Sequence, residues 1–225
     1  MRLRHLTASV FLRPLWLAAV LYIFTSTCAA AQLPHQTGPS RPNELVELTR
    51  LDPTIRLDIR YATTHNFMGQ VLYLQARAFL QRPAAEALVR VQAELKPLGY
   101  GLLVFDGYRP WRITKQLWDH TPASKKQFVA DPRRGSRHNR GCAVDLTLCD
   151  LATGREIAMP SSYDEMSPRS FTTYAGGTPA PRTARDLLRR LMEAHGFAGL
   201  AAEWWHFDFR DWQLYPVQDV PFEKL

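Results

Sequence analysis

A single carboxylate within an apolar strand constrains the fold of this chain more than any other feature. Residues 143–148 (AVDLTL) alternate as a strand does, with three aliphatic side chains on one face (Val144, Leu146 and Leu148). Asp145 lies on the other face. If solvent covers that face, its charge needs no explanation. If the face lines a cleft, the charge must be paired or must bind a metal ion.

A histidine seven residues earlier is a candidate partner for this carboxylate. His138 and Asp145 can meet only if the chain bends between them, and Gly141 permits such a bend. Taken alone, a pair of this kind is more often structural than metal-binding.

A second segment shifts the balance toward metal binding. Residues 203–209 (EWWHFDF) predict a final strand with His206 on the face away from the core and Glu203 at its entrance. Two imidazoles and a carboxylate with one open position are the ligands of catalytic zinc. A further carboxylate beside that position can accept a proton from water. His138, Asp145 and His206 can therefore bind one ion, with Glu203 as the base.

Two nearby residues leave alternatives open. Asp208 shares a face with His206, so it either orients that imidazole or is a plain acid at the strand edge. Cys142 and Cys149 are expected to be buried free thiols, because one strand would hold them too far apart for a disulfide. A thiolate ligand at Cys142 is the alternative.

The first 31 residues have the features of a secretory signal peptide. Three arginines precede the apolar run at 15–24 (LWLAAVLYIF), and three alanines at 29–31 provide a cleavage site. The run is half of the ~20 apolar residues that a spanning helix needs. We expect cleavage near Ala31, a periplasmic or otherwise exported protein, and no stable membrane span afterwards. An uncleaved anchor is the alternative.

The charge of the chain gives no case for a nucleic-acid partner. The formal net charge is +7, and cleavage after Ala31 leaves 25 basic against 21 acidic residues. The sequence has no stripe of lysine and arginine with interleaved aromatics. This small surplus is compatible with attraction to anionic surfaces of the cell wall or membrane.

Strand and helix patterns mix without strict alternation, which favours an α+β fold. We expect a flexible leader over 32–43 and a single compact domain over 44–225, with a mainly antiparallel central sheet flanked by helices and a zinc site in a cleft. Residues 153–182 are rich in proline and glycine and predict a long irregular segment, which is often functional. Thr183 is expected to cap the helix that follows.

The two site segments resemble a known signature. SRHNRGCAVDLTL at 136–148 followed by EWWHF at 203–207 is similar to the S-x-H-x-x-G-x-A-x-D … E-x-x-H pattern of the zinc D-alanyl-D-alanine dipeptidases (VanX-type), relatives of the D,D-carboxypeptidases. The similarity extends to DIRYAT at 58–63, NF at 66–67, DGYRP at 106–110, YDEM at 163–166 and DVPF at 219–222.

The resemblance implies roles for the central residues. His138, Asp145 and His206 would be the ligands of one zinc ion per chain, and Glu203 would be the catalytic base. Arg109 would stabilise the negative oxygen of the tetrahedral intermediate, for which a fixed guanidinium is well suited. A surface salt bridge is the alternative for Arg109.

The resemblance also implies contacts to the two ends of a dipeptide. Asp164 would hold the ammonium group and Ser136 would lie near the carboxylate. A solvated loop acid explains Asp164 almost as well. Tyr61 and Phe67 either wall the pocket or belong to the core.

The implied activity is hydrolysis of the small dipeptide D-Ala-D-Ala to two D-alanines, in peptidoglycan turnover or in glycopeptide resistance. One alternative is a D,D-carboxypeptidase or endopeptidase that acts on peptidoglycan stem peptides through a pocket open on the amine side. Another is a non-catalytic wall-binding module, which would lack a ligand or the base; the sequence lacks neither. The oligomeric state is left open.

Overall fold

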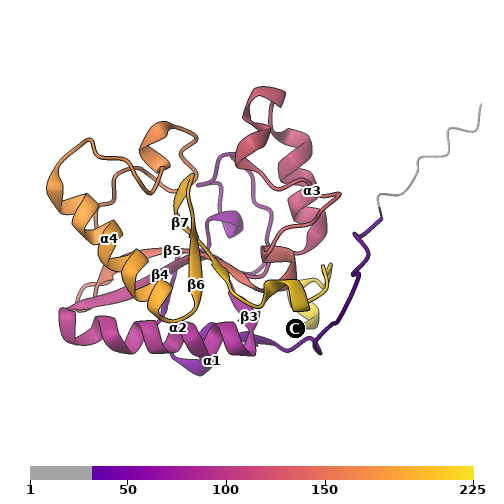
Figure 1. Ribbon diagram of the computed structural model, residues 1–225, viewed down its shortest axis with the longest axis horizontal. Helices are drawn as coiled ribbons and strands as arrows, with labels where there is room; N and C mark the ends of the chain where they lie inside the picture. Colours follow the sequence, from indigo (N-terminus) through magenta and orange to yellow (C-terminus); the bar gives the residue numbers. More distant parts are fainter. Residues whose placement is uncertain (1–31) are drawn as a thin grey trace, which may run out of the picture. The chain divides into compact units, whose positions relative to one another are not determined.

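The central element of the fold is a five-stranded sheet with the strand order β2-β4-β5-β7-β6 (Figure 1). The computed structural model describes residues 32–225, so the predicted signal peptide at 1–31 lies outside the described residues. The strands of the sheet are β2 (Arg56–Leu57), β4 (Tyr100–Asp106), β5 (Ala143–Asp150), β6 (Phe197–Leu200) and β7 (Glu203–Phe209). The helices are α1 (Leu48–Leu51), α2 (Arg82–Leu95), α3 (Trp111–His120) and α4 (Pro179–Ala194).

The strands pair mainly in antiparallel fashion. β4 pairs with β5, β5 with β7, and β7 with β6, all antiparallel, whereas the short edge strand β2 runs parallel to β4. Strands β1 (Leu45–Glu47) and β3 (Phe79–Gln81) form a separate antiparallel ribbon. The predicted α+β fold with a mainly antiparallel central sheet is confirmed.

One face of the sheet is covered by α2 and α4, which also contact each other. Helix α2 completely buries four apolar side chains that share one face at helical spacing (Ala84, Leu88, Val91 and Leu95). A proline in its first turn removes no hydrogen bond there and favours the helical backbone angle. Burial of each large aliphatic side chain contributes roughly 1.5–3 kcal/mol, so this face forms the main core.

Helix α4 begins earlier than predicted. Its first residue is Pro179, and Thr178 precedes it in an extended conformation. The predicted cap at Thr183 is therefore wrong, because Thr183 lies inside the helix. The proline at 179 was the relevant signal, since proline is favoured at the first helical position.

The opposite face of the sheet carries the irregular segment between β5 and α4. Tyr163 of this segment packs against a small apolar cluster formed by Leu103, Phe105 and Cys149. The segment has a single short 3-10 turn at Pro168–Ser170 between β5 and the start of α4. It covers part of this face and leaves the side chains of Asp145 and His206 at the bottom of a cleft.

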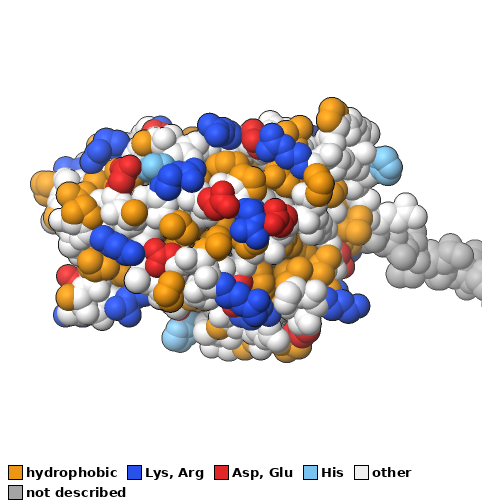
Figure 2. Space-filling model, turned by 90° about the horizontal axis from the view of Figure 1, so that it is seen from below, with side chains coloured by type: hydrophobic (Ala, Val, Ile, Leu, Met, Phe, Trp, Pro, Cys, Tyr) orange, Lys and Arg blue, Asp and Glu red, His pale blue; other side chains and the backbone are white. Residues whose placement is uncertain are grey.

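The remaining expectations concern cysteines, the leader and the surface. Cys142 and Cys149 are buried free thiols, as predicted. Residues 32–43 contain no helix or strand, and Arg41 pairs with Asp211 at 2.7 Å. Within residues 32–225, no helix is both long and apolar enough to cross a membrane. The face seen in Figure 2 shows basic, acidic and hydrophobic side chains interspersed.

Candidate metal centre

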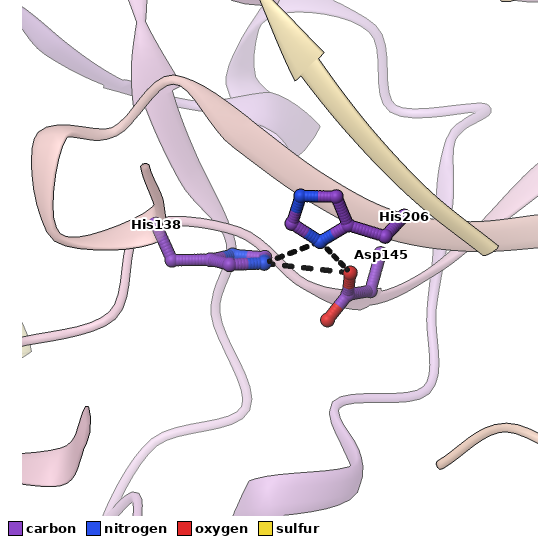
Figure 3. Close-up of side chains that lie close together, drawn as sticks. All are labelled: His138, Asp145 and His206. Carbon is purple, nitrogen blue, oxygen red and sulfur yellow. Dashed lines mark hydrogen bonds and ion pairs between the residues drawn. The ribbon is translucent and has the colours of Figure 1, made fainter. Parts of the chain in front are cut away.

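Three donor atoms from three parts of the chain converge at one point (Figure 3). His138 Nε2 lies 3.2 Å from His206 Nδ1 and 3.4 Å from Asp145 Oδ1. His206 Nδ1 lies 3.0 Å from the same carboxylate oxygen. All three side chains are buried. The group has the composition and the spacing of a site that could hold a metal ion.

Strand pairing brings two of these residues together. Asp145 and His206 are 61 residues apart in sequence and are direct partners in the antiparallel ladder of β5 and β7. Direct partners on one face of such a ladder have their Cβ atoms about 4.5–5.5 Å apart. The polar face predicted for both strands is therefore shared between them.

A sharp bend brings in the third residue. His138 begins a 3-10 turn, and Gly141 follows it with a φ of 68°. A Cβ atom at Gly141 would lie 2.4 Å from Leu45 Cδ2, so only glycine fits both the backbone angle and the space. The bend that the sequence analysis required is present at this glycine.

In each imidazole, the outer nitrogen, which points away from the three converging donor atoms, is hydrogen-bonded to an acceptor. His138 Nδ1 donates to the carbonyl of Gly107 at 2.7 Å, and His206 Nε2 donates to Asp208 Oδ1 at 2.9 Å. Since neither acceptor can donate, each outer nitrogen carries the hydrogen, and each inner nitrogen can present a lone pair to the centre. Of the two roles considered for Asp208, this contact favours orientation of His206.

The Gly107 carbonyl is itself fixed by the β1–β3 ribbon. A Cβ atom at Gly107 would lie 2.8 Å from the carbonyl oxygen of Phe79 in β3, so the backbones approach too closely for any other residue. The next residue, Tyr108, donates its backbone N–H to that Phe79 oxygen at 2.7 Å. The ribbon thereby sets the position of the carbonyl that orients His138.

The charged groups where these donor atoms converge favour a bound cation. Burial opposes ionisation of Asp145, but the imidazoles of His138 and His206 outweigh it and hold the pKa of Asp145 below its usual range. Burial also disfavours the charged form of His206, but hydrogen bonds to Asp145 and Asp208 raise its pKa well above the usual value. A metal ion or a proton at this point supplies the positive charge that these carboxylates favour.

The second oxygen of Asp145 is held from the other side. Tyr163 donates its hydroxyl to Asp145 Oδ2 at 3.0 Å, and Arg109 Nη2 lies 3.7 Å from the same oxygen. The ring of Tyr163 packs against Phe105 and Trp205, with centroids 4.7 and 5.5 Å away. Only Oδ1 is left to face the two imidazoles.

Arg109 is fixed in the cleft by a buried acid. Its Nε and Nη2 atoms donate to Asp106 Oδ2 at 2.9 and 2.7 Å, and Asp106 Oδ1 accepts from the hydroxyl of Tyr73 at 2.8 Å. The guanidinium also lies over the ring of Tyr61, 5.1 Å from its centroid. Arg109 is 8% exposed, so its ion pair is not on the surface.

Glu203 stands beside the three converging donors. Its Oε2 atom lies 3.8 Å from His206 Nδ1, and the residue lines the cleft at the first position of β7. Burial raises the pKa of Glu203 to about 7. A carboxylate with this pKa can both accept and return a proton near neutral pH.

The cleft has a volume of about 280 Å³, slightly below the usual range of ~300–1,000 Å³ for ligand pockets. Tyr61, Phe67, Ser136 and Asp164 all line it. Tyr61 is also 2% exposed and belongs to the core, so both of the roles considered for it apply. Ser136 Oγ accepts from the backbone N–H of His138 at 3.2 Å.

Asp164 adopts an uncommon backbone conformation in this cleft. Its φ of 59° is the one positive value at a non-glycine residue among those described. Its carboxylate accepts from the hydroxyl of Tyr61 at 3.1 Å, and burial raises its pKa well above the usual range. Such strain is typical of functional positions, and the partial burial argues against a freely solvated loop acid.

Some residues of the site were missed by the sequence analysis. Asp106 had a detectable signal, because it lies three residues before Arg109 in the DGYRP motif. Tyr163 had the same kind of signal, because it is the first residue of the YDEM similarity at 163–166. Tyr73 had none, since its contact arises only from the tertiary fold. Cys142 is not among the donors that converge, so the thiolate alternative has no support.

Comparisons with known proteins agree with one another. The sequence pattern of the family described as D-ala-D-ala dipeptidase matches residues 41–224. A D-alanyl-D-alanine dipeptidase of Escherichia coli is 36% identical over 178 residues, which cover 79% of this chain and 91% of that protein. The D-alanyl-D-alanine dipeptidase of Enterococcus faecalis is 36% identical over 183 residues, covering 72% and 89%.

Solved structures include more distant likenesses. The LdcB LD-carboxypeptidase aligns with a TM-score of 0.43 and 18% identity, over 77% of this chain and 71% of that chain.

Proposed function

The chain belongs to the D-Ala-D-Ala dipeptidase family of metallopeptidases. We propose that it hydrolyses D-Ala-D-Ala to two D-alanines and that it uses one zinc ion. The observation that carries the proposal is the convergence of His138, Asp145 and His206 with Glu203 beside them. A non-catalytic wall-binding module has no need of this complete set.

The donor set fits zinc. Two imidazole nitrogens and one carboxylate oxygen are usual zinc ligands, and bonds of about 2.0–2.2 Å in a tetrahedron give ligand-to-ligand edges of roughly 3.3–3.6 Å. The observed separations of 3.0, 3.2 and 3.4 Å are close to these edges. When bound, the ion would supply Lewis acidity that polarises the scissile carbonyl and lowers the pKa of water.

Glu203 is proposed to move the proton. Its carboxylate takes a proton from the attacking water as the water oxygen bonds to the carbonyl carbon. It then gives that proton to the leaving nitrogen as the C–N bond breaks. Its position beside His206 and its pKa of about 7 support both halves of this transfer.

Arg109 is proposed to stabilise the carbonyl oxygen as it becomes negative. The two hydrogen bonds to Asp106 hold the guanidinium in place before substrate arrives. A preorganised donor of this kind needs no rearrangement during the reaction, and loss of one such donor costs about 10²–10³ in kcat.

The amine end of the cleft favours a free dipeptide over a longer peptide. Asp164 and Tyr61 lie there as an acid and a phenol that could receive an ammonium group. Burial opposes the charge of Asp164, and an arriving ammonium would stabilise it. Ser136 lines the cleft and is proposed to lie near the carboxylate of the dipeptide.

The test compares a free and a blocked substrate. Zinc content is measured first, and hydrolysis of D-Ala-D-Ala and of N-acetyl-D-Ala-D-Ala is then followed with wild type and Asp164→Asn. We expect the wild type to cleave only the free dipeptide, and Asp164→Asn to raise KM for it. Preferential cleavage of the blocked substrate would instead favour the D,D-carboxypeptidase or endopeptidase. Zinc binding with no cleavage of either would overturn the peptidase function.

Export is a separate part of the proposal and depends on residues 1–31. The arginines, the apolar run and the alanines at 29–31 support a signal peptide and a periplasmic or otherwise exported enzyme, which would meet wall-derived dipeptides. Mass spectrometry of the protein recovered from cells should give a mature chain that starts near residue 32. An intact Met1 would instead indicate a retained anchor.

A further inference from the structure

A second depression lies beside the catalytic cleft and has a volume of about 530 Å³. Its walls contain two half-buried tryptophans and four cations. We call these six residues the basic groove: Trp118, Lys126, Arg134, Arg137, Arg140 and Trp212.

The basic groove and the cleft share part of their lining. Five residues line both depressions (Val129, Ala130, Gly135, Ser136 and Arg137). Tyr61 and Asp164 line the cleft alone. In Figure 1, the segment after α3 and the segment before α4 stand on opposite sides of β7. The basic groove therefore meets the cleft along residues 129–137 and not at Asp164.

Most cations of the basic groove have no acidic partner. Across residues 32–225, Lys126, Arg134 and Arg140 form no ion pair with a carboxylate. The acid in the lining, Asp131, is paired with Arg133 at 2.6 Å. Like charges that share a concave surface repel one another, so a bound anion would relieve this repulsion.

Stacking on the tryptophans holds several of these cations in place. Lys126 Nζ lies 4.4 Å from the ring centroid of Trp118, and the guanidinium of Arg137 lies 4.7 Å from that of Trp212. Lys126 Nζ donates one N–H to the carbonyl oxygen of Trp118, and its contact with the ring face restrains the ammonium without using the other two donors. Arg137 also lies 3.4 Å from Asp208, which orients His206, so one end of the basic groove is next to the metal centre.

We propose that the basic groove binds a second carboxylate, on the side chain of the substrate's leaving residue. This inference rests on the proposed function, because it takes the dipeptide to lie with its ammonium at Asp164 and its leaving residue toward Ser136. The carboxylate of an acidic side chain then extends past Ser136 into the basic groove. The enzyme therefore accepts dipeptides with an acidic second residue, such as D-Ala-D-Glu.

The first experiment compares an acidic substrate with its neutral isostere. We expect kcat/KM for D-Ala-D-Glu to exceed that for D-Ala-D-Gln by roughly tenfold in the wild type, as one charge-assisted hydrogen bond would produce. The ratio of kcat/KM for D-Ala-D-Glu to kcat/KM for D-Ala-D-Gln should fall toward unity in Lys126→Met and in Arg134→Gln. Lys125→Met is the matched control, because this exposed lysine lies outside the groove lining and should leave the ratio unchanged. Equal rates for the two substrates in the wild type would overturn the proposal.

The second experiment needs no catalysis. Trp118 and Trp212 line the basic groove, so their fluorescence should change on saturation with D-glutamate and less with D-glutamine. In a Lys126→Met, Arg134→Gln double variant, D-glutamate should change the fluorescence no more than D-glutamine does. Inorganic phosphate that binds as tightly as D-glutamate would show that the groove recognises charge alone, which would contradict the assignment. Glutamate binding in an enzyme that cleaves no dipeptide would support the groove and reject the proposed function.

Discussion

The hydroxyl of Tyr163 lies 3.0 Å from Asp145 Oδ2, while Oδ1 of the same carboxylate faces His138 and His206. The irregular segment before α4 therefore contacts the metal centre directly through Tyr163. The neighbouring residue, Asp164, lines the cleft. Two consecutive residues thus contact the carboxylate of Asp145 and the lining of the cleft.

Tyr163→Phe should weaken zinc binding without disturbing the fold. The ring remains packed against Phe105 and Trp205, but Asp145 loses the donor that fixes its second oxygen. Loss of such an outer contact lowers metal affinity roughly 10- to 100-fold. Competition with a chelator measures this affinity, and the visible spectrum of the cobalt-substituted protein reports the ligand geometry. Unchanged affinity and spectrum would show that Tyr163 only fills space.

Glu203→Gln should lower kcat by about two to four decades, because an amide cannot accept the proton of the attacking water. Zinc should be retained, since Glu203 is not among the three converging donors. Steady-state kinetics with metal analysis measure both properties. Glu193→Gln on the exposed face of α4 is the matched control. A variant at Glu203 with wild-type kcat would reject the assignment of the base.

Arg109→Lys should lower kcat/KM by about 10²–10³, although the charge is conserved. A lysine ammonium cannot make the two hydrogen bonds that Nε and Nη2 of Arg109 donate to Asp106. The cation is then no longer fixed beside the reacting carbonyl. Arg109→Met should also destabilise the fold by about 3–5 kcal/mol, since it leaves the buried Asp106 without its cation. Kinetics and urea denaturation separate the two effects, and equal stability of both variants would contradict this account.

Leu88→Ala should reduce the free energy of unfolding by about 2–5 kcal/mol. Leu88 is fully buried in the stripe that α2 presents to the sheet, so its removal leaves a cavity. Leu98→Ala is the control, because that side chain is 52% exposed and should change stability by less than about 0.5 kcal/mol. Urea denaturation of both variants gives the comparison, and equal losses would show that the α2 face is not the main core.

Local patterns predicted the strands that carry Asp145 and His206 and the helix α4, with an error at the start of that helix, but they did not predict the short strands β1, β3 and β6. The range of β7 matches the prediction residue for residue, because Trp205, Phe207 and Phe209 recur at every second position and alternate with His206 and Asp208. The start of α4 was misplaced, since Thr183 has the chemistry of a cap but lies beyond a proline that already begins the helix. Several residues near the start of a helix can have the chemistry of a cap, and only packing decides at which of them the helix begins.

The candidate site was predictable where chemistry and motif coincided. Asp145 was identified because a charged side chain is unusual in an otherwise apolar strand, and His206 because it points away from the core. His138 and Glu203 were identified from their positions before Asp145 and at the entrance of the final strand, and the family resemblance implied the roles of all four. The contact of Tyr73 with Asp106 spans 33 residues, and that of Tyr163 with Asp145 spans 18. Tyr73 does not depart from the pattern around it, and Tyr163 belongs to the YDEM similarity at 163–166 without a role following from it. The sequence therefore did not indicate which side chain either hydroxyl would contact.

The close approach of Gly107 to Phe79 links the β1–β3 ribbon to the candidate metal centre. Two hydrogen bonds in series, from Tyr108 to Phe79 and from His138 to Gly107, connect the outer ribbon with the imidazole. Neither strand of this ribbon lines the cleft, yet a substitution that loosens β1 from β3 should disturb the hydrogen bond that orients His138. We therefore expect the metal content of such a variant to report how well the ribbon is packed against the rest of the domain.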